Sequence, residues 1–428
     1  MNVTKTSIKF LKKLYRQILA SIAFYPVLIS FGFLIFGFVI TSVENIDIVN
    51  ELKKEIPYLI ISDPDIAKTI LSTLIGGILS LTVFSFSMVM VVLNQASSNY
   101  SPRLLPGLIS NKKHQIILGF YIGTLLYSVL ILISLGASDI SKNSVGLSTM
   151  IAAIFGIVCV SLFVYFIDTI SKSIQIYNIV DKISSYSHDM LDRVIENQEQ
   201  SGSEDQYWRV IHSNKTGYYK GFDSSLMSDY FKENKNVVEI LPYKDQHIWE
   251  GMPILCIHEK IPDNELKSLL LCFHFSPDKH EDNSYTGGMI KLMEVAVKAM
   301  SPGINDPGTA IDAVTKIGPL LDKSFKIFPQ TAQYVYHNNL KLIKNNVSPD
   351  ELMRLIIQPI RLYAKQDSSV MYVLINTLLY IRNDDSVLTP GRIAVNRELD
   401  LVREDISESI FNEGDRQRIE LLFKDDLR

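Results

Sequence analysis

Four long apolar windows before residue 171 constrain this chain more than any other feature. They span Ile18–Ile40, Ile66–Leu93, Gln115–Gly136 and Leu147–Ile167. A helix that crosses the hydrocarbon core of a bilayer needs about 20 predominantly apolar residues, and each window has that length. Four such runs in succession do not fit the buried helices of a large soluble core. The sequence therefore predicts a transmembrane domain of four helices in residues 18–170.

The basic residues in the short flanks predict how these helices are oriented. Residues 1–17 carry Lys5, Lys9, Lys12, Lys13 and Arg16. The flank between the second and third windows is also basic, whereas the flank between the third and fourth has one lysine, Lys142. Basic flanks remain on the cytosolic side of a membrane. The chain is therefore expected to be a multi-pass membrane protein with both termini in the cytosol.

The second window has a periodic polar stripe, formed by Thr73, Ser80, Ser87 and Asn94. Seven residues are close to two helical turns, so these side chains lie on one face of the helix. Small and hydroxyl-bearing residues allow helices to pack closely, which is one interpretation. The other is that the stripe lines a water-filled pathway. It leads into a polar cytosolic loop that contains Ser101, Pro102 and Arg103.

The remaining 258 residues (171–428) predict a cytosolic α+β domain. Residues 171–206 should form a helical extension and linker, 207–284 a subdomain of short strands, and 285–428 a subdomain that is almost entirely helical. The expected strands are Trp208–His212, Gly217–Tyr219, Val237–Leu241 and Pro253–His258. Ser224–Lys232 is expected to form a helix between them.

A proline-rich segment, here called the elbow, interrupts the helical subdomain. Its distinctive residues are Ser301, Pro302, Gly303, Asn305, Asp306 and Pro307. A helix should end before Pro302, because proline disfavours a helical conformation in the residue before it. Asp306 should cap the next helix, with Pro307 in its first position. The alternative is that the free N–H groups of this helix start bind a ligand or serve in gating.

The elbow, together with the segment Ser101-Pro102-Arg103-Leu104-Leu105, resembles the signature of a bacterial family of predicted membrane proteins of unknown function. The resemblance covers nearly the whole chain. It also includes Gly217-Tyr218, Gly251-Met252-Pro253-Ile254-Leu255 and Glu281-Asp282. Gly308 departs from the pattern, which has a bulky apolar residue there. The resemblance implies the membrane topology and a location in the plasma (inner) membrane of bacteria, but no activity.

Residues that bind metals or carry out catalysis give only weak signals. Cys256-Ile257-His258 and Cys272-Phe273-His274 repeat a Cys-x-His pattern that two neighbouring strands could present to zinc. The alternative is coincidence, with Cys272 at the end of a helix over Asp263–Leu270. His280, Glu281 and Asp282 could hold a divalent ion with Asp306, or form a solvated run of charges. We predict no cofactor and no metal.

Three functions remain open from the sequence. The first is a homo-oligomeric channel or solute pathway with a cytosolic domain that assembles or gates it. The second is a membrane-anchored sensor or scaffold whose cytosolic domain binds a ligand or partner. The third, a membrane enzyme, has little support, because the chain shows no phosphate loop, nucleophile elbow or metalloprotease helix. With 42 basic against 46 acidic residues, the chain is not expected to bind nucleic acid. The lipid bilayer is the expected partner.

Overall fold

The computed structural model describes residues 21, 23–43, 61, 63–99, 112–136, 146–200, 207–277, 284–336 and 339–425. The chain divides into two compact units. The first, which we call the four-helix unit, contains all described helices before Gln175. The second, the C-terminal unit, contains all helices and strands from Ile176 onward.

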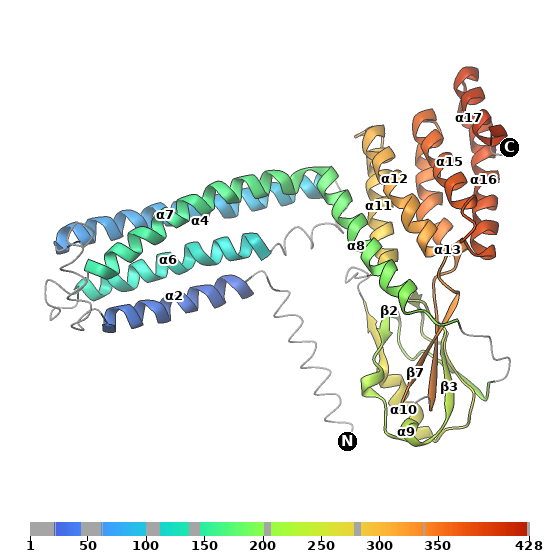
Figure 1. Cartoon of the computed structure of the whole chain (residues 1–428), viewed down its shortest axis with the longest axis horizontal. Coiled ribbons are helices and arrows are strands. Elements are labelled where there is room, and N and C mark those ends of the chain that lie inside the picture. Colours follow the sequence, from blue (N-terminus) through green and yellow to red (C-terminus); the bar gives the residue numbers. More distant parts are fainter. Residues whose placement is uncertain are drawn as a thin grey trace. The chain divides into compact units, whose positions relative to one another are not determined.

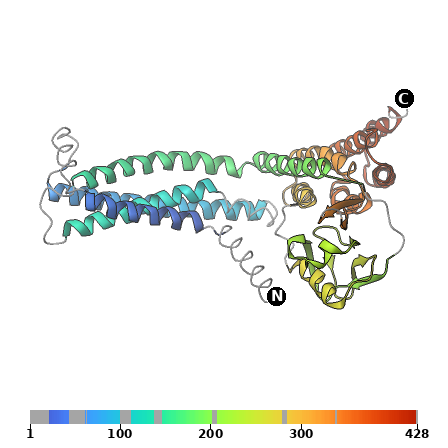
Figure 2. The same ribbon diagram turned by 60° about the horizontal axis from the view of Figure 1, so that its bottom comes forward.

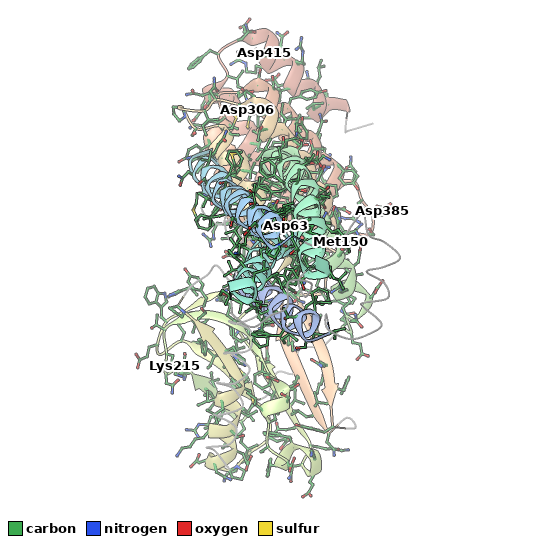
Figure 3. All side chains as sticks on the ribbon, turned by 90° about the vertical axis from the view of Figure 1, so that its left-hand side faces the viewer. Asp63, Met150, Lys215, Asp306, Asp385 and Asp415 are labelled. Atoms are coloured by element: carbon green, nitrogen blue, oxygen red, sulfur yellow. The ribbon has the colours of Figure 1, made fainter. Side chains whose placement is uncertain are left out.

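The four-helix unit consists of α2 (Phe24–Val43), α4 (Pro64–Asn99), α6 (Lys112–Gly136) and α7 (Gly146–Ile174), which lie alongside one another (Figures 1 and 2). Each helix is long and apolar enough to cross a membrane, so the prediction of four spans is confirmed. The chain is a multi-pass membrane protein. In Figure 3, which looks toward one end of the helices, Asp63 before α4 and Met150 in α7 both lie near the viewer.

The first two helices differ from the predicted windows at their ends. Helix α2 begins at Phe24 and has Pro26 in its first turn, where the missing backbone N–H of proline is tolerated; Ile18 lies outside the described residues. The Asp63 carboxylate caps the start of α4, because it accepts hydrogen bonds from the backbone N–H groups of Asp65 (2.8 Å) and Ile66 (3.3 Å). With 36 residues, α4 is about 54 Å long and exceeds the hydrocarbon thickness of about 30 Å.

Glycines bring α2 close to α6. A Cβ atom at Gly119 would meet the Cα of Pro26 at 3.0 Å, and one at Gly123 would meet the Phe33 ring at 2.7 Å. Likewise, a Cβ at Gly156 of α7 would lie 2.5 Å from Leu74 of α4. Small residues allow this close approach, which is how helices associate where lipid removes the hydrophobic driving force.

The C-terminal unit contains a row of helices (Figure 1). Its members are α8 (Ile176–Glu196), α11 (Tyr285–Ala299), α12 (Pro307–Ser324), α15 (Ser368–Arg382), α16 (Thr389–Ser409) and α17 (Glu413–Asp425). Helix α8 contacts α11 and α12, α12 contacts α15, and α15 contacts α16 and α17. The segment between α12 and α15 also contains α13 (Pro349–Leu352), a π-helical turn (Met353–Ile357) and α14 (Gln358–Ala364).

Two small sheets complete the C-terminal unit. The five-stranded sheet has the order β1 (Arg209–His212), β5 (Pro253–Ile257), β3 (Asn236–Ile240), β8 (Leu340–Asn345) and β7 (Gln330–Val335). The three-stranded sheet has the order β4 (His247–Ile248), β2 (Gly217–Phe222) and β6 (Phe273–Ser276). Side chains of both sheets share one apolar core, which includes Val238, Ile257, Leu342, Tyr219 and Phe273.

The four predicted strands are present as β1, β2, β3 and β5. The segment that was predicted as almost entirely helical contains the hairpin β7–β8, and β8 pairs with β3 in parallel. The predicted helix Ser224–Lys232 is split into a 3-10 turn (Ser224–Leu226) and the one-turn helix α9 (Tyr230–Glu233). Between them, the Ser228 hydroxyl donates to Glu265 of α10 (Asp263–Cys272), a tertiary contact that local sequence does not reveal.

Candidate functional site

The polar stripe lies on the face of α4 that the other described helices leave uncovered. Thr73, Ser80, Ser87 and Asn94 are all exposed. A second row with the same spacing is buried and contains Leu71, Ile78, Ser85 and Val92. Each buried residue precedes an exposed one by two positions, which is about 200° around a helix. The stripe is therefore opposite the face that packs on α6 and α7.

The hydroxyl groups of this face bond within their own helix. Thr73 Oγ1 donates to the Thr69 carbonyl at 2.8 Å, and Ser80 Oγ donates to the Gly76 carbonyl at 2.9 Å. A hydroxyl that is satisfied in this way can face lipid, protein or water at little cost. The hydrogen bonds therefore permit both interpretations of the stripe, packing and pathway.

Two glycines lie beside the stripe and do not pack against the other described helices. A Cβ atom added at Gly76 or Gly77 would meet no atom within 4 Å. This contrasts with Gly119, Gly123 and Gly156, where an added Cβ would collide with a neighbouring helix. Glycine in a helix interior costs about 1 kcal/mol relative to alanine. The pair therefore leaves space on this face of α4 that the described part of the chain does not fill.

The elbow forms the predicted helix cap. One oxygen of Asp306 accepts the Thr309 N–H at 3.1 Å, and the other accepts the Thr309 hydroxyl at 2.6 Å. Pro307 is at the start of α12, and Asn305 adopts a positive φ of 46° that tightens the turn. Because the Asp306 carboxylate already occupies the helix start, the geometry supports the structural interpretation of the elbow. A Cβ at Gly308 would approach Asp306 Oδ1 at 3.4 Å, which is ordinary van der Waals contact, so this position does not require glycine for space.

The elbow lies at the end of the C-terminal unit where α8 begins. Lys316 pairs with Asp181 at 2.6 Å and Lys323 pairs with Asp192 at 2.5 Å, so α12 runs parallel to α8. The start of α12 is therefore level with the start of α8. Pro302, Ile304 and Asn305 are exposed there.

The two Cys-x-His pairs do not form a common site. Cys256 is in β5 of the five-stranded sheet, whereas Cys272 ends α10 and His274 belongs to the three-stranded sheet. Burial raises the pKa of the Cys256 thiol, which disfavours the thiolate that zinc requires. Among the described residues, no group of three or more His, Cys, Asp or Glu side chains is placed to hold a metal ion.

Some predicted site residues lie outside the part of the chain that the structure describes. Ser101, Pro102 and Arg103 lie outside the described residues, as do His280, Glu281 and Asp282. The basic N-terminal flank and Lys142 are also outside them. Their roles remain predictions from the sequence.

Two polar clusters were not predicted. Arg361 of α14 donates to Glu398 of α16 at 2.8 Å and also pairs with Asp405, and its side chain is only 9% exposed. Burial raises the pKa of Glu398, and the guanidinium of Arg361 opposes this shift.

The second cluster surrounds Asp245. Its carboxylate accepts a hydrogen bond from the Lys220 ammonium at 3.0 Å and another from the Ser284 hydroxyl at 2.7 Å. The partners are far apart in the chain, so no local spacing indicates them.

Comparisons with known proteins give a family but no activity. An uncharacterized protein of Mycobacterium tuberculosis (strain CDC 1551 / Oshkosh) is 24% identical over 263 residues, which cover 56% of this chain and 48% of the relative. An uncharacterized protein of Mycobacterium bovis (strain ATCC BAA-935 / AF2122/97) has the same identity and coverage. The chain thus spans about half the length of the curated relatives that it matches. No solved structure matches it.

The family comparison covers most of the chain. Residues 20–379 match the DUF2254 family, whose description is "Predicted membrane protein". The match includes the four spans, both sheets and the elbow. It confirms the family resemblance seen in the elbow and the loop after the second span. The chain belongs to the DUF2254 family of predicted membrane proteins.

Proposed function

We propose that this protein is the subunit of a homo-oligomeric membrane pathway for ions or small solutes, in which the α4 helices of several copies surround the path. The C-terminal units would assemble or gate it from the cytosol. The observation that carries this proposal is the position of the polar stripe on the uncovered face of α4. The stripe extends from Thr73 to Asn94, which is about 32 Å of helix and matches the thickness of a bilayer core.

Two features of α4 favour contact with other copies rather than with lipid alone. Gly76 and Gly77 leave room on this face for the close approach of another helix. Asn94 adds an exposed amide to the hydroxyls, and an amide is more costly than a hydroxyl to leave against lipid. In an oligomer, these groups would face the symmetry axis, and the apolar remainder of the exposed surface would face lipid.

The proposal is tested by the reactivity of cysteines introduced along α4. The native residues Cys159, Cys256 and Cys272 are buried and are replaced first. Single cysteines are then placed at Thr73, Ser80 and Ser87 and treated with a small water-soluble thiol reagent in intact membranes. Reaction requires a thiolate, which forms in water far more readily than in hydrocarbon. We expect labelling at all three positions.

Matched controls distinguish water from lipid and from packed protein. Ile75 and Val89 are half-buried on the other side of α4, and Phe86 is 52% exposed but about 100° from Ser87. Cysteines at these three positions should stay unlabelled. If the stripe is also unlabelled and the protein is monomeric in detergent, the pathway proposal is wrong. That result would favour the membrane-anchored sensor or scaffold.

A further inference from the structure

We infer that Asp65 makes the proposed pathway selective for cations. The inference rests on the proposed function and adds the class of substrate to it. Asp65 is in the first turn of α4, and its side chain is 92% exposed. It is not one of the four residues that define the polar stripe, but its position on the helix connects it to them.

The helix periodicity places Asp65 in line with the stripe. Asp65 precedes Thr69 by four residues, which is about 40° around the helix, and Thr69 precedes Thr73 by the same interval. The hydroxyl of Thr69 donates to the Asp65 carbonyl at 2.8 Å, and that of Thr73 donates to the Thr69 carbonyl. One face of α4 therefore begins with a carboxylate and continues with hydroxyls.

Asp65 is the one acidic residue within α4. The sequence of α4 contains one other charged residue, Lys68. Lys68 is about 100° from Thr69, so it lies beside the stripe rather than on it. Its Nζ is 3.7 Å from Asp65, and its side chain is 50% exposed. An exposed pair of this kind is weak and leaves most of the carboxylate field at the mouth of the path.

Symmetry would multiply this charge. In a closed ring of identical subunits, each copy contributes one Asp65 at the same height. Rings of carboxylates select cations in membrane channels, because they raise the local cation concentration and repel anions. The rest of the stripe offers neutral hydroxyls and an amide, which can coordinate a partly hydrated ion but add no charge. The expected substrates are therefore small cations.

The test is the reversal potential of the full-length protein in planar bilayers under a gradient of KCl. The wild type should prefer K⁺ over Cl⁻. Asp65→Asn should lower the permeability ratio about fivefold, the factor that corresponds to about 1 kcal/mol. Asp65→Glu keeps the charge and should restore the preference, whereas Lys68→Gln should increase it.

Asp63→Asn is the matched control. Asp63 is two residues away and carries the same charge, but it caps the helix through the N–H groups of Asp65 and Ile66. Asparagine caps a helix as well as aspartate does, so this variant loses charge without losing the cap. Its selectivity should stay close to that of the wild type. If Asp65→Asn and Asp63→Asn conduct with unchanged selectivity, the role of Asp65 is wrong and the pathway stands. If the wild type does not conduct, the pathway and this inference both fail.

Discussion

The four-helix unit and the C-terminal unit hold their helices together by different means. Among the described residues of the four-helix unit, the ion pairs Asp65–Lys68 and Asp168–Lys172 each lie within one helix and are exposed. Contacts between these helices depend instead on glycines and aromatic rings. In the C-terminal unit, ion pairs connect different helices, and those of Arg361 are nearly buried.

The difference follows from the two solvents. Inside a bilayer, charges are expensive and apolar side chains gain nothing by leaving lipid, so close packing is the main source of affinity between helices. In the C-terminal unit, apolar burial supplies the stability, and buried charges are tolerated where they are paired. A glycine in the four-helix unit therefore holds two helices together by close packing, and an arginine in the C-terminal unit does so by a buried ion pair. This comparison makes three predictions about stability.

The largest effect is expected at Arg361. Arg361→Met should lower the free energy of unfolding by about 3–5 kcal/mol, because it leaves Glu398 buried without its partner. Chemical unfolding of the detergent-solubilised full-length protein measures this change. Arg397→Met is the control, since the Arg397–Asp350 pair is exposed and should contribute at most about 1 kcal/mol. Equal effects of the two substitutions would contradict the importance of buried pairs in this unit.

A smaller effect is expected at the contact between α2 and α6. Gly123→Ala should destabilise the four-helix unit by about 1–3 kcal/mol, because its Cβ would lie 2.7 Å from the Phe33 ring. Gly77→Ala has open space within the chain and should stabilise an isolated subunit by up to about 1 kcal/mol. Titration with a denaturing detergent measures both. If both substitutions changed the stability by the same amount, the close packing at Gly123 would not explain why it is glycine.

The smallest effect is expected at the elbow. Asp306→Ala should destabilise the C-terminal unit by about 0.5–2 kcal/mol, the usual cost of losing a helix cap. Asp306→Asn retains a capping side chain and should cost less. Thermal unfolding of the full-length protein, followed by the helical signal, compares the two variants. An unchanged midpoint together with a loss of transport would instead assign the elbow to a ligand or gating site.

The sequence by itself determined the features that depend on local physics. Four spans follow from the length of the apolar windows, because a bilayer of fixed thickness selects helices of matching length. The cap at Asp306 follows from the Asp-Pro pair, because both residues act on neighbouring backbone groups. The strands β1, β2, β3 and β5 follow from short apolar runs between turn residues.

Only the tertiary structure decided which surfaces meet. The spacing of Thr73, Ser80 and Ser87 predicts one face of a helix, but the same spacing describes the buried row of Leu71 and Ile78. The hairpin β7–β8 was missed because its strands are completed by β3, about 100 residues earlier in the chain. The Arg361 cluster joins residues 37 and 44 positions apart. Such pairings depend on burial and partners that a local pattern does not contain, so they become visible only when the chain is folded.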